Sequence, residues 1–532
     1  MKRKQGSGDL RTNPIPMNLG KYQSILPMYG IDKAQPFFPP IEYLFKTEKL
    51  ANPHEYGIKF PELITSISGT TIKTSSGKEI ETHPKITMLL SPFKWMKGEH
   101  TSLDLPGISD KSNVTHQKLQ SPNTAGYVGS IISVALSLSE CQHFPKVYGV
   151  YTGISNEHTI DISDDYEELC ERKWFSLNIG KTFDLKLNEP STQKIQYTRS
   201  ARIPLNLGDE IELDDIKEVE GMPSNETNAA ELDTVFEEKV TNSDDSSSDV
   251  STDYVFQIES VSLDDDDIDD SDNDNISEEE QSFAWATFKN VPVQLTIMEK
   301  LEGTLYDLFT KFPDSNKHFA WLAQIVFALA YAQRTFGLTH NDLHGNNIMY
   351  TKTDIEFLYY SYSSDTYAVP TFGYILKIID FDRGIASIKV QGMKEARTFM
   401  SDQFHEDEEA GGQYNVEPFY NTHFQVIKPN PSFDLVRLAT SIFWDLFPNG
   451  PKYEEYSENV VFKLFIKWLT LPDGSSVLFH KNNPKIDRYF GFNLYKAIAR
   501  YCKDVIPRKE ISEFKCFIGE CPIGSNLLTI EM

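Results

Sequence analysis

The chain has 532 residues and a formal net charge of -27. A single hydrophobic core needs far fewer residues, so we expect either two or three domains or one large domain with insertions. The charge is unevenly spread, because residues 209–280 hold 28 Asp and Glu against two Lys, and the rest of the chain is almost neutral. Composition therefore gives no reason to expect direct binding to nucleic acid.

Cysteine usage and hydropathy indicate the compartment and whether the chain spans a membrane. Five cysteines are too few for a disulfide scaffold in a chain of this length and match no zinc-ligand spacing, which favours reduced thiols in the cytosol. No apolar run reaches about 18 residues, and the N-terminal stretch lacks the apolar core of a signal peptide. We expect neither a membrane span nor secretion.

The first part of the chain predicts a small sheet. Residues 1–56 carry proline-rich stretches such as FFPP and little periodicity, and are predicted to form an extended arm. From residue 57, β-branched runs broken at Gly69 and Gly77 predict strands, and KITMLL follows as another. Residues 124–140 show apolar side chains near helical spacing, and HFPKVYGVYTGI returns to a strand pattern that ends near residue 154.

Residues 155–285 leave this compact pattern. They contain some apolar islands but end in SLDDDDIDDSDNDNISEEE. Such a run cannot bury enough apolar surface to offset the entropy of ordering it, so we predict an insertion whose last 40 or so residues are disordered. Two interpretations stay open: an insertion that only solvates, or a regulatory tether, phosphorylated on its serines or binding a basic partner.

Regular patterns resume at residue 286. VPVQLTIMEK predicts a strand and Glu302-Gly303 predicts a turn. We therefore expect residues 286–303 to form the last strand of the sheet and the hinge that follows it. A long helix follows, with Asp314 or Ser315 as its N-cap and Gly337 at its end. The stretch after Gly337 is LTHNDLHGNNIMY, and a further strand ends in Asp380-Phe381-Asp382.

These two stretches offer the groups that phosphoryl transfer from ATP requires. That reaction needs an Asp to accept the hydroxyl proton, an Asn and a second Asp to hold magnesium ions, and a Lys to hold the phosphates. His340, Asp342 and Asn347 have the form H-x-D-x-x-x-x-N, and Asp380 ends a strand where a D-F-G would stand. Each motif alone is weak, but their joint occurrence after a long amphipathic helix is strong.

At these residues the chain resembles the eukaryotic-type protein kinase superfamily. HNDLHGNNIMY, EFLYYSYSSDTYAVPTFGYILKIIDFDRG and NPSFDLVRLATSIF are similar to the serine/threonine kinases of nucleocytoplasmic large DNA viruses, the mimivirus and phycodnavirus type, over about residues 60–470. The resemblance implies an α+β, bilobal protein-kinase-like fold, with a small β-rich N-lobe, the acidic insertion, and a mainly α-helical C-lobe over residues 304–532 with a helical C-terminal end. It also implies an ATP- and Mg²⁺-dependent enzyme that phosphorylates Ser or Thr of protein substrates, located in the host cytoplasm or the virion.

The resemblance also assigns roles. Asp342 would be the catalytic base, Asn347 and Asp380 the metal ligands, and Asp434 the residue that braces the catalytic loop. Lys85 is the expected phosphate-binding lysine, with Lys94 as its competitor. The remaining expected nucleotide contacts are Met298, Glu299 and Leu301 at the hinge and Gly69 in the phosphate loop.

The sequence departs from the family pattern at several points. No G-x-G-x-x-G precedes the lysine, and no acidic residue lies between Asp110 and Glu140, which leaves Glu140 as the candidate helix partner of the lysine. Asp382 replaces the third-position glycine. Asn341 replaces the arginine that would pair with a phosphate on the activation segment, so we predict activity that needs no phosphate there, whether on Ser387, Thr398 or Ser401.

Three other functions stay open. HNDLHGNN is also close to the loop of small-molecule kinases of the aminoglycoside and choline phosphotransferase type. About 50 residues separate Asp380 from SFDLVRL, enough for an activation segment, and this favours a protein substrate. A pseudokinase and a non-enzymatic virion scaffold protein are the remaining alternatives.

Overall fold

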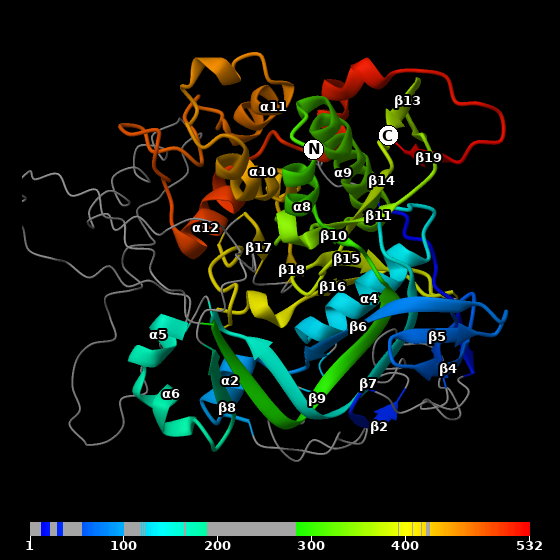
Figure 1. Ribbon diagram of the computed structural model, residues 1–532, viewed down its shortest axis with the longest axis vertical. Helices are drawn as coiled ribbons and strands as arrows, with labels where there is room; N and C mark the ends of the chain where they lie inside the picture. Colours follow the sequence, from blue (N-terminus) through cyan, green and yellow to red (C-terminus); the bar gives the residue numbers. More distant parts are fainter. Residues whose placement is uncertain are drawn as a thin grey trace, which may run out of the picture.

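The computed structural model describes residues 12–21, 29–35, 56–100, 119, 121, 123–188 and 283–531, apart from 164–165, 392, 407, 417 and 422–425. These residues form a mixed α/β molecule with a β-rich sheet region and a largely helical region (Figure 1). The predicted disorder of the acidic run lies outside the described residues. Among the helices of the described ranges, none combines the length and apolar character needed to cross a membrane.

The sheet region is built on two long strands. Strands β7 (Val147–Asp161) and β9 (Phe283–Glu299) pair antiparallel over most of their length. Side chains are buried at alternate positions from Ala284 to Phe288, as expected for a strand with one face in a core. The sheet order is β2-β7-β9-β6-β5-β4, and β8 also pairs with β9. The other members are β2 (Ile31–Gln35), β4 (Ile64–Ser68), β5 (Thr71–Thr74), β6 (Glu79–Met88) and β8 (Asp184–Asn188).

Two predicted boundaries in this region are wrong. The sheet was expected to stop near residue 154, but β7 continues to Asp161, and helices α5 (Tyr166–Glu171) and α6 (Lys173–Asn178) lead into β8. The apolar side chains of Phe175 and Phe183 are buried against the sheet, which explains why this part of the expected insertion is ordered. The expected arm also contributes β1 (Leu19–Lys21), which pairs with β3 (Tyr56–Ile58), and the edge strand β2.

Helix α4 (Ala125–Ser137) lies between the sheet and the rest of the molecule (Figure 1). It contacts β7 and β9 on one side and β15 (Ile385–Ile388) on the other. Tyr127, Ile131 and Val134 are buried in the main hydrophobic core, which continues into the helical region. The outer half of the sheet has a core of its own, formed with α2 (Pro92–Met96) and α6.

The helical region is organised around α9 (Ser315–Phe336), which is buried along almost its whole length. Asp314 caps its first turn by accepting from the Asn316 N–H at 2.9 Å, and Gly337 ends it with φ +62°. Both ends were predicted. The other helices are α8 (Leu305–Lys311), α10 (Phe433–Leu446), α11 (Val460–Leu469), α12 (Gly491–Tyr501) and α13 (Pro507–Glu510), with the 3-10 segment η6 (Ile511–Phe517).

Small sheets complete this region. Strands β10 (Gly303–Thr304), β11 (Ile348–Lys352) and β14 (Tyr374–Ile378) form one sheet. Strands β12 (Phe357–Tyr362) and β13 (Asp365–Pro370) form an antiparallel hairpin. The C-terminal end was expected to be helical; it contains α12, α13 and η6 but finishes in β19 (Leu527–Ile530), which pairs in parallel with β12. Two short hairpins lie between Asp380 and α10: β15 with β16 (Arg397–Met400), and β17 (Tyr420–Asn421) with β18 (Val426–Ile427).

Candidate active site

The loop between α9 and β11 is held by a carboxylate that is distant in sequence. Asp434, in the first turn of α10, accepts the backbone N–H of His340 through Oδ2 and that of Asn341 through Oδ1, both at 2.9 Å. The Asp434 side chain is fully buried. Burial raises the pKa of this carboxyl group above its usual value, although His340 and the two backbone donors oppose the rise. Asp434 thus lies where the sequence predicted a brace for the loop.

Asn341 gives the loop its sharp turn. Its φ of +65° lies in the left-handed region, which is costly for a residue with a side chain. The Asn341 amide donates to the carbonyls of Thr339 at 3.1 Å and Arg383 at 3.0 Å, while its Oδ1 accepts from the Tyr414 hydroxyl at 2.8 Å. Three side-chain contacts and the Asp434 brace therefore offset the backbone strain beside Asp342.

His340 joins this loop to the end of β14. Its Nδ1 accepts from the Asp342 N–H at 3.3 Å, and its Nε2 lies 2.8 Å from the Ile379 carbonyl. These partners select the tautomer that carries its proton on Nε2. The His340 ring also packs against Phe381, with ring centroids 5.1 Å apart. His340 is a buried structural residue that fixes the loop relative to Asp380.

Strand pairing brings Asn347 and Asp380 to the same place. Asn347 directly precedes β11 and Asp380 follows β14, and these strands pair antiparallel with Ile348 opposite Ile378. The Ile379 N–H donates to the Asn347 carbonyl at 2.9 Å. The Asn347 amide also donates to the Asp342 carbonyl at 2.9 Å, which ties it to the loop. Asp342, Asn347 and Asp380 therefore lie together, as their spacing predicted.

Lys85 reaches this group from the sheet region. Its Nζ lies 2.9 Å from Oδ1 of Asp380 and 2.9 Å from Oδ1 of Asp382. Burial lowers the pKa of the Lys85 ammonium, but the two carboxylates outweigh this, so the pKa stands above its ordinary value. Burial raises the pKa of Asp382 to about 6 and the nearby Asp380 charge adds to the rise, against the opposing Lys85. The pKa of Asp380 is lowered, because Lys85 outweighs the effect of burial.

The Asp342 carboxylate has two partners that the sequence did not suggest. Its Oδ1 accepts from the hydroxyl of Tyr495, on α12, at 2.6 Å. Its Oδ2 lies 3.9 Å from the Arg383 guanidinium. The guanidinium of Arg437 lies over the Tyr495 ring, 4.8 Å from its centroid. The base candidate thus accepts one hydroxyl hydrogen bond and lies near two guanidinium groups.

Two ion pairs hold the segment after Asp382. Arg383 Nη2 lies 3.7 Å from Glu409 Oε2. Lys94, on α2, contacts Glu408 Oε1 at 2.6 Å, and the side chains of both partners are mostly buried. Lys94 is thereby committed to this segment, whereas Lys85 meets Asp380. The two lysines that the sequence offered as phosphate-binding candidates therefore have different partners.

The expected adenine and phosphate contacts lie in two different places. Met298 and Glu299 end β9, and Leu301 follows, half-buried. The Glu299 carboxylate accepts from the Lys146 N–H at 3.0 Å and from Lys377 Nζ at 3.2 Å, so its side chain serves the packing between β9 and β14. Gly69 forms the exposed turn between β4 and β5 with φ +58°, and nothing lies within 4 Å of its Cβ position.

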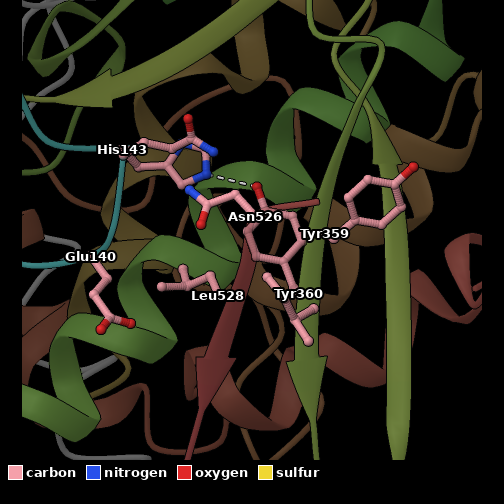
Figure 2. Close-up of a pocket in the computed structure, with 8 residues that line it drawn as sticks. Glu140, His143, Tyr359, Tyr360, Asn526 and Leu528 are labelled. Carbon is pink, nitrogen blue, oxygen red and sulfur yellow. Dashed lines mark hydrogen bonds between the residues drawn. The ribbon is translucent and has the colours of Figure 1, made fainter. Parts of the chain in front are cut away.

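Glu140 does not meet Lys85. It lies beyond the end of α4 and lines a cavity of about 360 Å³ with His143, Tyr360 and Asn526 (Figure 2). His143 Nε2 accepts from the Tyr360 hydroxyl at 2.7 Å (Figure 2). The Nδ1 atom of His143 lies 2.8 Å from the Leu376 carbonyl. Burial lowers the pKa of His143 to about 4. This cavity is separate from the Asp342 group, and two of its polar side chains, His143 and Tyr360, are paired with each other.

The side chains around Lys85 suit magnesium. Asp380 and Asn347 offer hard oxygen ligands, and the Asp380 and Asp382 carboxylates facing one ammonium leave a net negative charge. Across the described part of the chain, no three His, Cys, Asp or Glu side chains converge closely enough to hold a metal ion alone. Mg²⁺ is usually bound through one or two carboxylates together with substrate phosphates and water.

Sequence reasoning missed the residues that complete the site from far along the chain. Tyr495 is 153 residues from Asp342, and Tyr414 is 73 residues from Asn341. Neither position carries a local motif. Arg383 and Asp382 could have been predicted as site residues from the sequence, because they directly follow Asp380 and Phe381. The chain matches no protein-family model and no curated protein sequence.

Proposed function

We propose that this protein is an ATP- and Mg²⁺-dependent protein kinase of bilobal kinase-like fold that phosphorylates Ser or Thr. Asp342 would accept the proton of the attacking hydroxyl. The hydroxyl oxygen forms a bond to the γ-phosphorus while the bond to the β,γ-bridging oxygen breaks, and ADP leaves. Asn347 and Asp380 would hold the magnesium ions, and Lys85 the phosphates. When bound, magnesium neutralises the charge that develops on the phosphoryl oxygens.

One observation carries this proposal. Lys85 Nζ lies 2.9 Å from Asp380, 295 residues away, beside the loop that bears Asp342 and Asn347. Base, metal ligands and phosphate-binding cation are the complete set that phosphoryl transfer needs, and they come from the two regions of the molecule. A structural ion pair alone would not explain why the Asp342 loop is braced by Asp434 in a strained conformation.

The protein substrate class rests on the segment between Asp380 and α10. It forms the β15–β16 hairpin and is tied down by Lys94 and Arg383 through Glu408 and Glu409. A segment of this length that contacts both regions of the molecule supports a docking surface for a polypeptide, in preference to the small-molecule kinase alternative. A viral origin and a site of action in the host cytoplasm or virion belong to the proposal through the sequence resemblance alone.

The test is transfer from γ-labelled ATP with Mg²⁺ to casein and to the protein itself. We expect transfer by the wild type, and losses of about 10²-fold to 10⁴-fold in Asp342→Asn and Asp380→Asn. Asp354→Asn, at an exposed carboxylate between β11 and β12, is the matched control and should transfer normally. Thermal unfolding of each variant shows whether the fold is intact.

The alternatives predict different results. Transfer to an aminoglycoside or to choline, with none to protein, would replace the proposal by a small-molecule kinase. ATP binding without transfer to any acceptor would indicate a pseudokinase. A protein that binds neither ATP nor Mg²⁺–ATP would belong to the non-enzymatic scaffold class.

A further inference from the structure

Lys85 takes both of its carboxylate partners from one loop. Asp380 and Asp382 are separated only by Phe381, whose side chain is buried against His340 and Phe144. Asp380 has φ +63°, in the left-handed region, and its Oδ1 accepts from the Asp382 N–H at 3.5 Å. With Phe381 anchored in the core, this turn presents both carboxylates to the same ammonium, at 2.9 Å each.

Helix α4 is the element beside Lys85 that would be expected to supply a carboxylate. Residues 125–137 contain no acidic side chain. Where α4 faces the loop it carries Gly129, and a Cβ there would clash with Asp382 Oδ1 and lie 3.2 Å from the Asp382 Cα. The space that a side chain of α4 would occupy is therefore filled by the Asp382 carboxylate.

The two carboxylates differ in exposure. The Asp380 side chain is 42% exposed and that of Asp382 21%, because Asp382 is covered by α4. Asp380 can thus be reached from solvent by a metal ion, whereas Asp382 is enclosed between Gly129 and Lys85.

Resting on the proposed kinase function, we propose that Asp382 is the positioning residue of Lys85. Asp382 lies in the loop after β14 and provides the carboxylate that α4 lacks. Because Gly129 has no side chain, α4 leaves room for this carboxylate. Asp382 holds the ammonium in place, and Asp380 is left to bind the metal ion. Asp382 acts through Lys85 and has no direct contact with the phosphates.

The first experiment measures the pairing without relying on catalysis. An amine-selective acylating reagent is applied to the protein without nucleotide, and modification of Lys85 is followed by mass spectrometry. Without Asp382 the Lys85 amine is held by Asp380 alone and is more often free to react, so Asp382→Asn should be modified several-fold faster than the wild type. Asp382→Asn keeps the size of the side chain, and thermal unfolding confirms that it folds.

The second experiment moves the carboxylate from the loop to the helix. Asp382→Gly alone should lower kcat/KM for ATP about 10²-fold, because Lys85 loses its position. In the double variant Gly129→Asp with Asp382→Gly, the new side chain starts from the place that Asp382 Oδ1 now occupies. Slow Lys85 modification and most of kcat/KM should return. Gly129→Asn with Asp382→Gly, equal in size but uncharged, should restore neither.

The Mg²⁺ dependence separates the two acids. Asp380→Asn should raise the Mg²⁺ concentration needed for half-maximal transfer, whereas Asp382→Asn should leave it unchanged. Unchanged Lys85 modification and unchanged kcat/KM in Asp382→Asn would overturn the inference, as would rescue by the Asn control. Wild-type protein that neither binds ATP nor transfers phosphate would count against the proposed function instead, and the modification rates would still decide whether Asp382 positions Lys85.

Discussion

The helical side of the site is held by many buried partners, and the sheet side by few. On the helical side, the loop before Asp342 is bound by Asp434, Asn341 and Tyr414, all fully buried. On the sheet side, Lys85 stands on β6 and depends on carboxylates that come from the opposite region. The difference teaches that the proposed base is positioned locally by a preformed framework, whereas the lysine is positioned only when the two regions are packed together.

The largest expected effect is at the brace of the helical side. Asp434→Ala leaves two buried backbone N–H groups without their acceptor, so we expect about 3 kcal/mol less unfolding free energy and the loss of phosphoryl transfer. Denaturant unfolding and ATP transfer measure the two effects. Asp445→Ala, an exposed carboxylate on the same helix, is the control. A stable, active Asp434→Ala protein would show that the loop holds itself.

The joint between the two regions should respond to acid. His143 links the turn after α4 to the Leu376 carbonyl and Tyr360, and burial lowers its pKa to about 4 in the folded protein. An unfolded His has a pKa near 6.5 and takes up the proton first, so stability present above pH 6.5 is lost as the pH falls towards about 4. Between pH 7 and pH 5 this amounts to about 2 kcal/mol.

Denaturant unfolding across that pH range checks the prediction against His143→Gln. Glutamine can donate to the Leu376 carbonyl and accept from Tyr360, but it does not titrate. The variant should therefore lose less stability between pH 7 and pH 5 than the wild type does. Equal slopes would mean that His143 is protonated in the folded protein at no cost.

A smaller effect is expected from the hydroxyl that supports Asn341. Tyr414→Phe removes the 2.8 Å hydrogen bond to Asn341 Oδ1 and should cost about 1 kcal/mol of unfolding free energy. We also expect a few-fold fall in kcat with little change in KM for ATP, because Asn341 adjoins Asp342. Tyr420→Phe, half-buried in β17, is the control. A change confined to KM would place the role of Tyr414 elsewhere.

The smallest expected effect concerns phosphorylation of the segment after Asp382. Arg383 and Lys94 already form ion pairs with Glu409 and Glu408, so the segment is held in place without a phosphate. Phosphatase treatment and the double variant Ser387→Ala with Thr398→Ala should leave transfer within about twofold, since Thr398 is exposed, Ser387 is half-buried, and such substitutions rarely cost much. Ser401 is fully buried and caps the turn at Gln403. Activity that appears only after phosphorylation would contradict the prediction.

What the sequence predicted follows the same division. The helix ending at Gly337, the strand before Asp380 and the loop from His340 to Asn347 were all readable, because caps, periodicity and short spacings are local signals. The strand β8 and the parallel strand β19 were missed, because their pairing partners lie about 100 and 170 residues away. Glu140 was a reasonable candidate for the Lys85 partner only as long as that partner was sought on the helix.

Asp382 and Asp380 share one turn, and this bears on how the proposed enzyme would be regulated. A carboxylate carried by a mobile helix can be withdrawn by a regulator that swings the helix outward. Here the two carboxylates that face Lys85 belong to a turn that Phe381 anchors in the main core. Rotation of α4 would therefore not carry either carboxylate with it. Control by an external partner would therefore act on the packing of the two regions, on the turn itself, or on the Tyr495 hydroxyl that covers Asp342.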